Sequence, residues 1–394
     1  YNRLYPILCI DCFIHVLKLS LATLMKNIII LVSAMNLGGA QRVVSILCDH
    51  WSKNGYKVTL ISTFTGNKID HYKVNDQVAL KSLRNNSIFS KIKILTLVLK
   101  LTQLRKIILD EKPDIILSFL TRVNVAAALA TIGLKTPLII CERTWKPFNT
   151  LSNNFFWMYQ LLFKNVKSII VQTDESRTWL RQHFPKINVD VIPNPISYPL
   201  PLQKGNILDP NTVFQKHRNL ILASGRLHKF KQFDLLMKAF CRVKDEYHNW
   251  DLVILGEGEE RENLDNLLIE LKARDRIFLP GSVGNMSDWY QRADLFVLSS
   301  SVEGFPNVLL EAMSYELPCI SFDCDTGPRD MIQNGINGIL VSPQEDERGL
   351  SEAMQSLITD ESFRRKMANN SAHIRDKYSV ETIMQKWNNV LDIR

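Results

Sequence analysis

Short apolar runs alternate with helix-periodic stretches along most of this chain, and this alternation constrains its fold more than any other feature. The first run, Asn27–Ser33, precedes a helical pattern from about Gln41 to Lys53, and Gly55 then marks the end of that helix. Strands that are apolar throughout and alternate with helices are typical of a parallel sheet covered on both faces. We therefore predict an α/β fold in which each run is a buried strand.

The runs form two series, separated by a proline-rich segment at 193–201 that we predict to be a linker. The predicted strands are Asn27–Ser33, Lys57–Ser62, Asp114–Phe119, Leu138–Cys141, Ser168–Gln172 and Val189–Ile192, then Leu220–Ala223, Leu252–Leu255, Ile277–Leu279, Leu295–Leu298, Cys319–Phe322 and Ile339–Val341. This order predicts two tandem doubly wound, Rossmann-like domains that face a cleft. In such folds a ligand binds at the carboxyl ends of the strands.

The same pattern sets the expected domain boundaries. We predict a first domain at 25–196, a second at 197–375, and a helix at 376–394 that packs back on the first domain. Residues 1–24 are apolar but are interrupted by Asp11, His15 and Lys18, which disfavours a membrane span. We expect them to be a leader or upstream extension outside the fold.

Charge is distributed unevenly between the two halves. Residues 1–200 hold 25 Lys and Arg against 11 Asp and Glu, a net +14, whereas residues 201–394 have a net −6. A basic half suits nucleic acid, anionic lipid or a phosphorylated substrate. Nucleic acid is disfavoured because no recognition helix or aromatic platform motif is present. The basic stretch Ser90–Lys112 either lies on an anionic membrane surface or packs one apolar face on the sheet and leaves its lysines in water.

The seven cysteines do not form a metal-binding pattern. Cys9 and Cys12 have C-x2-C spacing but lack a second pair or a following histidine cluster. Cysteines within apolar segments, at 48, 141, 241 and 319, are predicted to be small buried hydrophobic residues. We therefore expect that the protein binds no metal and that it resides in the reducing cytoplasm. If the basic stretch binds lipid, the alternative location is the inner face of the membrane.

The segment from Glu303 to Met313 contains the strongest functional signal. Two carboxylates, Glu303 and Glu311, lie eight residues apart and flank a Gly-Phe-Pro-Asn sequence. Pro306 suits a helix start, so the N–H groups of Asn307 and Val308 would form an anion site at the helix N-terminus. A phosphate between two acceptors for sugar hydroxyls predicts a nucleotide-sugar pocket, although an exposed loop acid and a helix-surface acid would give the same pair.

Three glycine-containing loops follow predicted strands. Gly38-Gly39 follows the first strand and would let backbone approach a phosphate, although a tight turn would also explain it. Arg226 and Lys231 follow the first strand of the second domain and could hold a diphosphate from two sides, although most basic loops are simply solvated. Gly256-Glu257-Gly258-Glu259 is a turn near the base or ribose, in which both acids are better explained as first-turn helix residues.

In this order, these motifs resemble the family 4 glycosyltransferases of the GT-B fold. The resemblance extends over residues 25–394 and rests on the Gly-Gly loop, G-R-x4-K, E-G-F-P-N-x3-E-A-M and Asp323-Cys324-Asp325-Thr326-Gly327-Pro328-Arg329-Asp330. It implies a retaining, metal-independent hexosyl- or N-acetylhexosaminyltransferase. Such an enzyme needs no cofactor besides its nucleotide-diphospho-sugar co-substrate, for which we favour UDP over GDP. The implied acceptor is a lipid-linked or cell-surface glycan precursor.

The resemblance also implies roles for individual residues. Arg226 and Lys231 would hold the diphosphate, Glu303 would bind donor-sugar hydroxyls and Glu311 would hold the ribose, which makes Glu303, Arg226 and Lys231 the expected catalytic groups. Donor binding as a whole is expected from Gly38, Gly39, Arg226, Lys231, Val283, Glu303, Phe305, Asn307, Val308 and Glu311.

One departure from the family leaves an alternative open. Many members carry a histidine after the fourth strand of their first domain, and the corresponding segment here, Ser118–Asn124 after the predicted strand Asp114–Phe119, contains none. Arg122, Asn124, Glu142 and Arg143 are candidates for acceptor contacts, and equally for ordinary helix and loop polar residues. A non-catalytic nucleotide-sugar or glycan-binding protein of the same fold is therefore the alternative function.

Overall fold

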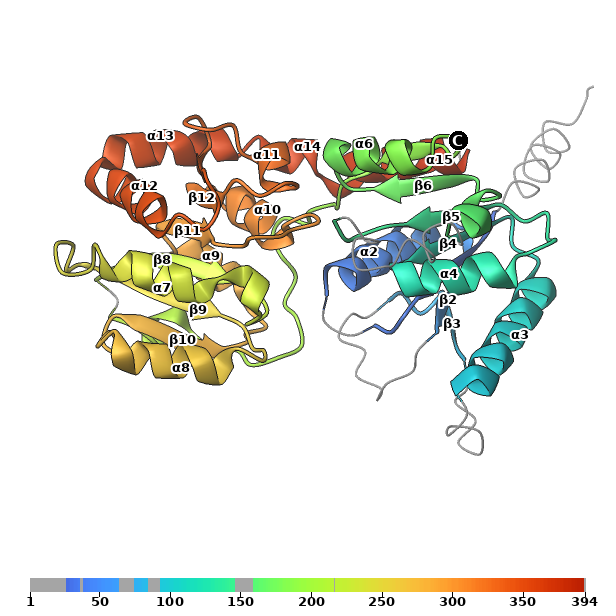
Figure 1. Cartoon of the computed structure of the whole chain (residues 1–394), viewed down its shortest axis with the longest axis horizontal. Helices are drawn as coiled ribbons and strands as arrows, with labels where there is room; N and C mark the ends of the chain where they lie inside the picture. Colours follow the sequence, from blue (N-terminus) through green and yellow to red (C-terminus); the bar gives the residue numbers. More distant parts are fainter. Residues whose placement is uncertain are drawn as a thin grey trace, which may run out of the picture.

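The protein is described by a computed structural model covering residues 26–35, 38–63, 74–83, 93–145, 159–215 and 217–392. The chain forms two parallel sheets with helices on their faces, and these lie side by side in Figure 1. This confirms the predicted α/β class with two doubly wound sheets. The predicted extension 1–24, with Cys9 and Cys12, lies outside the described residues.

The first sheet has the strand order β3-β2-β1-β4-β5-β6-β7. Its strands are β1 Asn27–Val32, β2 Lys57–Ser62, β3 Ala79–Ser82, β4 Ile115–Phe119, β5 Leu138–Cys141, β6 Ser168–Val171 and β7 Val189–Val191. Its helices are α2 Gly39–Lys53, α3 Lys93–Glu111, α4 Thr121–Ala130 and α6 Asp174–His183. β3 was not predicted from the sequence, because this four-residue edge strand is mostly exposed and has no apolar run.

The second sheet has the order β10-β9-β8-β11-β12-β13. Its strands are β8 Asn219–Ser224, β9 Trp250–Leu255, β10 Ile277–Gly281, β11 Leu295–Leu298, β12 Cys319–Phe322 and β13 Gly338–Val341. The helices are α7 Phe233–Cys241, α8 Arg261–Glu270, α9 Met286–Arg292, α10 Asn307–Ser314, α11 Pro328–Met331, α12 Glu347–Thr359, α13 Glu361–Ser371, α14 Ile374–Lys377 and α15 Val380–Leu391, with 3-10 turns η2 Pro210–Thr212 and η3 Lys229–Lys231.

Strand order reverses at the same place in both sheets. β1 pairs in parallel with β2 on one side and β4 on the other, and β8 pairs with β9 and β11. At such a switch point the connections leave the two neighbouring strands in opposite directions, so a crevice opens at the carboxyl ends. The loops after β1 and β8 therefore start at the two places where a ligand is expected.

Helix α15 ends the described chain on the first domain rather than the second. Trp387 is fully buried, and its ring centroid lies 6.3 Å from the ring centroids of both Trp51 and Phe119. Lys26 Nζ donates to the carbonyl of Leu391 at 2.5 Å. Figure 1 shows α15 beside the first sheet, next to α6. The chain thus crosses between the domains twice, after β7 and again before α15.

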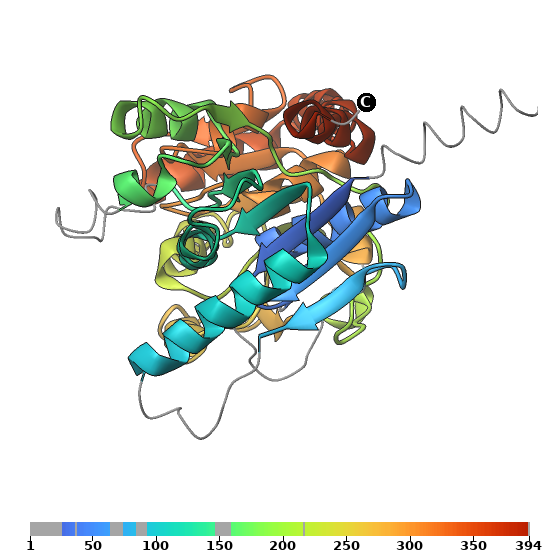
Figure 2. The same ribbon diagram turned by 90° about the vertical axis from the view of Figure 1, so that its right-hand side faces the viewer.

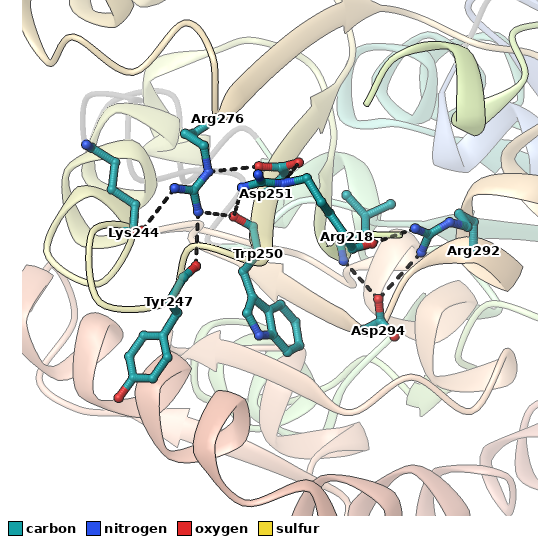
Figure 3. Close-up of polar contacts among 9 residues, drawn as sticks. Arg218, Lys244, Tyr247, Trp250, Asp251, Arg276, Arg292 and Asp294 are labelled. Carbon is teal, nitrogen blue, oxygen red and sulfur yellow. Dashed lines mark hydrogen bonds and ion pairs between the residues drawn. The ribbon is translucent and has the colours of Figure 1, made fainter. Parts of the chain in front are cut away.

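A buried ionic cluster stabilises the amino ends of the second sheet (Figure 3). Asp251 is almost fully buried and accepts from Arg276 Nε at 3.0 Å, while its other oxygen lies 2.7 Å from Arg218 Nε. Arg292 and Asp294 extend the cluster to the starts of β8 and β11 through the Arg218 carbonyl and the Leu220 N–H. The cluster lies at the amino ends of the strands, and the crevice lies at their carboxyl ends. We therefore assign it a structural role and not a role in ligand binding.

Helix α3 lies on the outer side of the first domain, away from the second domain (Figures 1 and 2). Leu104 and Ile108 are buried, whereas Leu97, Val98 and Leu109 are about half exposed and Lys106 is exposed. Lys91 of the predicted basic stretch lies outside the described residues. Within the described parts of the chain, every helix is either too short or too polar to span a membrane.

Candidate functional site

A cleft of about 950 Å³ lies between the carboxyl ends of the two sheets. Its walls come from the loop after β1, the start of α2, the loops after β8, β9, β10 and β11, and the start of α10. The ten residues expected to bind the donor all line it: Gly38, Gly39, Arg226, Lys231, Val283, Glu303, Phe305, Asn307, Val308 and Glu311. The fold therefore brings together residues that span more than half of the chain.

Helix α10 presents its N-terminus to this cleft. The helix begins at Asn307, so Pro306 is the residue immediately before it. The sequence predicted that Pro306 would lie inside the first turn. Leu309 and Leu310 already donate to the Pro306 carbonyl, at 3.0 and 3.2 Å. Asn307 and Val308 precede these bonds, and their N–H groups are among the four that a helix cannot satisfy internally. An anion in the cleft would be favoured here by the helix dipole as well.

Lys231 and Glu303 form an ion pair inside the cleft. Lys231 Nζ lies 2.5 Å from Glu303 Oε1, and both side chains are mostly buried. Each is held from behind, because Ser299 Oγ donates to the Lys231 carbonyl at 2.7 Å and Thr326 Oγ1 donates to the Glu303 carbonyl. A cation and a carboxylate are thus fixed at the meeting of the β8 and β11 loops, where they could contact neighbouring groups of one ligand.

Arg226 occupies a more open position. Its side chain is 71% exposed, and its guanidinium lies 3.1 Å from Glu259. Glu259 also lies 3.4 Å from His228 Nε2. The turn after β9 therefore contributes a carboxylate that positions Arg226 at the cleft edge, which the sequence did not indicate. Gly256 begins this turn, and glycine is required there because a Cβ would overlap the Gly225 carbonyl.

Glu311 lies at the inner end of the cleft and is fully engaged. Its Oε1 pairs with Arg42 of α2, and its Oε2 accepts from the Tyr290 hydroxyl at 3.0 Å. Burial and the neighbouring Glu311 carboxylate raise the pKa of Tyr290 well above its ordinary value, so this hydroxyl stays a donor. Neither Arg42 nor Tyr290 was singled out from sequence. Arg42 follows Gly39 by three residues, so a basic residue in that first helical turn was the available signal.

The start of α2 meets the start of α10 across the cleft. A Cβ on Gly39 would overlap the Asn307 side-chain amide, which would have to move away from its present position. Asn307 Oδ1 accepts from Asn194 Nδ2 at 2.7 Å, and Asn194 Oδ1 accepts from Arg143 at 2.9 Å. This chain of bonds links α10, the linker after β7 and the loop after β5. Sequence reasoning missed Asn194, which lies among the linker prolines.

The four acceptor candidates differ in accessibility. Arg122 is exposed, whereas Asn124 is fully buried and its amide donates to the Cys141 carbonyl and to Glu142 Oε1. Burial raises the pKa of Glu142 to about 7, although hydrogen bonds from Asn124 and Thr121 oppose the shift. Asn124 therefore stabilises the interior of the first domain through these hydrogen bonds and does not contact an acceptor. Arg143, unlike Asn124, lines the cleft.

Comparison with known proteins decides the family. The family described as Glycosyltransferase Family 4 matches residues 37–198, and the family described as Glycosyl transferases group 1 matches residues 206–373. The chain belongs to the family 4 glycosyltransferases. Enzymes of this family transfer a sugar from a nucleotide-sugar donor. Among the described residues of this glycosyltransferase, no group of three or more His, Cys, Asp or Glu side chains could hold a metal ion.

Curated relatives match this glycosyltransferase over nearly its whole length. It is 28% identical over 368 residues to the Campylobacter jejuni protein named GalNAc-alpha-(1->4)-GalNAc-alpha-(1->3)-diNAcBac-PP-undecaprenol alpha-1,4-N-acetyl-D-galactosaminyltransferase, covering 92% of this chain and 97% of that protein. It is also 28% identical to the amylovoran biosynthesis glycosyltransferase AmsD of Erwinia amylovora, covering 93% of this chain and 99% of the relative.

Solved structures agree on the fold. Sucrose-phosphate synthase from Thermosynechococcus elongatus superposes with a TM-score of 0.79 at 16% identity, covering 93% of this chain and 98% of the other. Anabaena HepE in complex with UDP superposes with a TM-score of 0.76 at 16% identity, covering 93% of this chain and 99% of the other. At this identity the likeness establishes the two-domain GT-B architecture, as the sequence predicted.

Proposed function

We propose that this protein is a retaining, metal-independent glycosyltransferase that moves a hexose or N-acetylhexosamine from a UDP-sugar to a lipid-linked glycan precursor. The observation that carries this proposal is the single cleft at both switch points, which is lined by all ten residues expected to bind the donor. Relatives that match along nearly the whole chain support a glycan acceptor, because the name of one gives an undecaprenol-linked acceptor and the name of the other gives amylovoran biosynthesis.

The proposed chemistry depends on charge that develops on the departing diphosphate. As the bond to the anomeric carbon breaks, the leaving oxygen gains negative charge, and fixed cations beside it lower the barrier. Lys231 and Arg226 supply these cations, and the N-terminus of α10 adds backbone N–H donors. In this proposal Glu303 orients the donor sugar. The acceptor hydroxyl attacks on the same face, where the leaving phosphate accepts its proton.

The donor is tested by measuring the protein's melting temperature with a panel of UDP- and GDP-sugars. A ligand at 100 times its Kd adds about 2.7 kcal/mol of stability, which is easily detected. We expect stabilisation by UDP-sugars and by UDP. Stabilisation by GDP-sugars alone would contradict the UDP assignment, and no stabilisation by any nucleotide sugar would contradict the proposed function.

The alternative is a non-catalytic nucleotide-sugar or glycan-binding protein. The observation that favours it is the loop after β4, where Leu120 and Thr121 follow Phe119 without a histidine. Slow release of UDP from the stabilising donor separates the two functions. Release that requires Lys231 supports the enzyme, whereas tight donor binding without release, even with undecaprenyl-diphosphate-linked glycans present, supports the binding protein.

A further inference from the structure

The Arg42–Glu311 ion pair joins the two domains at Glu311, the residue that the family resemblance assigns to the donor ribose. Arg42 lies in the first turn of α2, and its backbone N–H donates to the Gly38 carbonyl at 3.1 Å. Glu311 lies in α10, on the opposite wall. The two side chains are only 11% and 8% exposed, so the pair is poorly screened by water.

Both oxygens of Glu311 are occupied in this arrangement. Tyr290 holds Oε2 from within the second domain and is itself fully buried, so it cannot move aside. Arg42 reaches Oε1 from the other domain on a flexible side chain. A ribose hydroxyl that binds Glu311 therefore competes with the guanidinium of Arg42, which is the partner that can move, while the Tyr290 bond stays in place.

A displaced Arg42 needs a new partner, because an unpaired guanidinium in this setting is unfavourable. Its Nη2 is already buried without a hydrogen-bond partner among the described residues. Arg42 lines the cleft together with Gly38 and Gly39, opposite the N-terminus of α10. A diphosphate in the cleft offers oxygens that a planar guanidinium binds in a bidentate manner.

We propose that Arg42 is a further donor-binding residue, which occupies the ribose site in the free protein and moves to the donor diphosphate when ribose takes its place. This inference rests on the proposed role of Glu311. It has a specific consequence for selectivity. A nucleoside competes with Arg42 for Glu311 and offers the displaced guanidinium no new partner, whereas a nucleoside diphosphate competes in the same way and then binds Arg42 through its phosphates.

The test compares uridine and UDP binding by calorimetry in wild type and Arg42→Ala. We expect the variant to bind uridine about tenfold more tightly, because the competitor for Glu311 is gone. We expect it to bind UDP about tenfold more weakly, because a phosphate contact is lost. Arg226→Ala is the matched control. It removes another cleft cation that does not contact Glu311, so it should weaken UDP binding and leave uridine binding unchanged.

A double-mutant cycle with Glu311→Gln isolates the proposed exchange. In the Glu311→Gln background, Arg42→Ala should no longer improve uridine binding. Uridine affinity that is unchanged or weakened by Arg42→Ala in the wild-type background would overturn the exchange, while UDP binding by wild type would leave the proposed function intact. Wild-type protein that binds neither UDP nor any UDP-sugar would overturn both. Melting curves without ligand verify that each variant is folded.

Discussion

Lys231 Nζ and Glu303 Oε1 lie 2.5 Å apart, so the cation proposed for the leaving group is paired with the carboxylate proposed for the donor sugar. The pair connects the loops after β8 and β11, whose strands are neighbours at the switch point of the second sheet. A donor that enters the cleft meets a preformed pair rather than two independent charges. The free energy of orienting Lys231 is therefore supplied by folding and not by substrate binding.

Removing either cation is expected to slow turnover with the fold intact. Lys231→Ala and Arg226→Ala should each lower the rate of UDP release at saturating donor by at least about tenfold. Lys229→Ala is the control, because Lys229 lies on the same short helix η3 but does not line the cleft. Near-wild-type turnover in either cleft variant would remove that residue from the leaving-group site.

The two glutamates should respond differently to replacement by glutamine. Glu311→Gln is expected mainly to raise the KM for the donor and to weaken binding of free UDP, since ribose changes little during the reaction. Glu303→Gln should mainly lower kcat, because the donor sugar changes shape and charge. Titration with UDP distinguishes them. Equal loss of UDP affinity in both variants would show that the roles proposed for Glu303 at the donor sugar and for Glu311 at the ribose are wrong.

Carboxylates of α6 and α11 lie close enough to repel each other, which predicts a pH-dependent stability. Asp330 Oδ2 and Glu175 Oε2 are buried without hydrogen-bond partners among the described residues. Burial, and then the Glu175 charge, raises the pKa of Asp330 from 3.8 to about 6, while Lys377 opposes the shift. The Asp174 charge raises this pKa further, and a hydrogen bond with the Gly327 backbone lowers it. A raised carboxyl pKa means that the folded state holds a proton that the unfolded state loses first.

Asp330 should therefore contribute stability below pH 3.8 that is lost as the pH rises through about 6. Asp330→Asn is expected to raise the free energy of unfolding at pH 7.5 by on the order of 1 kcal/mol after allowance for solvent screening. It should also flatten the pH dependence between pH 4 and 6. Urea unfolding at several pH values measures both effects. The exposed Asp376→Asn is the control, and identical pH profiles in wild type and Asp330→Asn would refute the assignment.

Helix α3 is expected to bring the first domain to an anionic membrane. Its half-exposed Leu97, Val98 and Leu109 lie on the same helix as exposed Lys106. Replacing Lys106 and Lys112 by Glu should weaken sedimentation with phosphatidylserine vesicles by at least about tenfold, because each lysine near the surface contributes about 1 kcal/mol.

A charge-matched control for this helix is available in the second domain. Lys272 and Lys366 are also exposed, and Lys272 shares with Lys112 a positive φ, 51° against 47°. Their replacement by Glu changes the net charge equally but should leave vesicle binding unchanged. If both pairs of substitutions release the protein to the same extent, the binding depends on net charge and not on α3.

The sequence by itself was sufficient for the fold class and for most strands, because strands such as β1 and β12 each contain a single polar residue and are otherwise apolar and buried. It was also sufficient to select ten of the residues that line the cleft, since they lie in short motifs in the loops and helix starts that follow predicted strands. Such motifs are local, and the rule that ligands bind at carboxyl ends makes them interpretable without coordinates. β3 escaped prediction because an exposed edge strand lacks this local signal.

Only the tertiary structure decided how these residues are paired. Arg42 is separated from Glu311 by 269 positions, and Asn194 from Asn307 by 113. No local pattern relates such distant residues, because their contact depends on how two separately folded sheets pack across a cleft. The sequence therefore identifies the groups expected to face the donor. The packing of α2 against α10 determines which of these groups already have a protein partner before the donor binds.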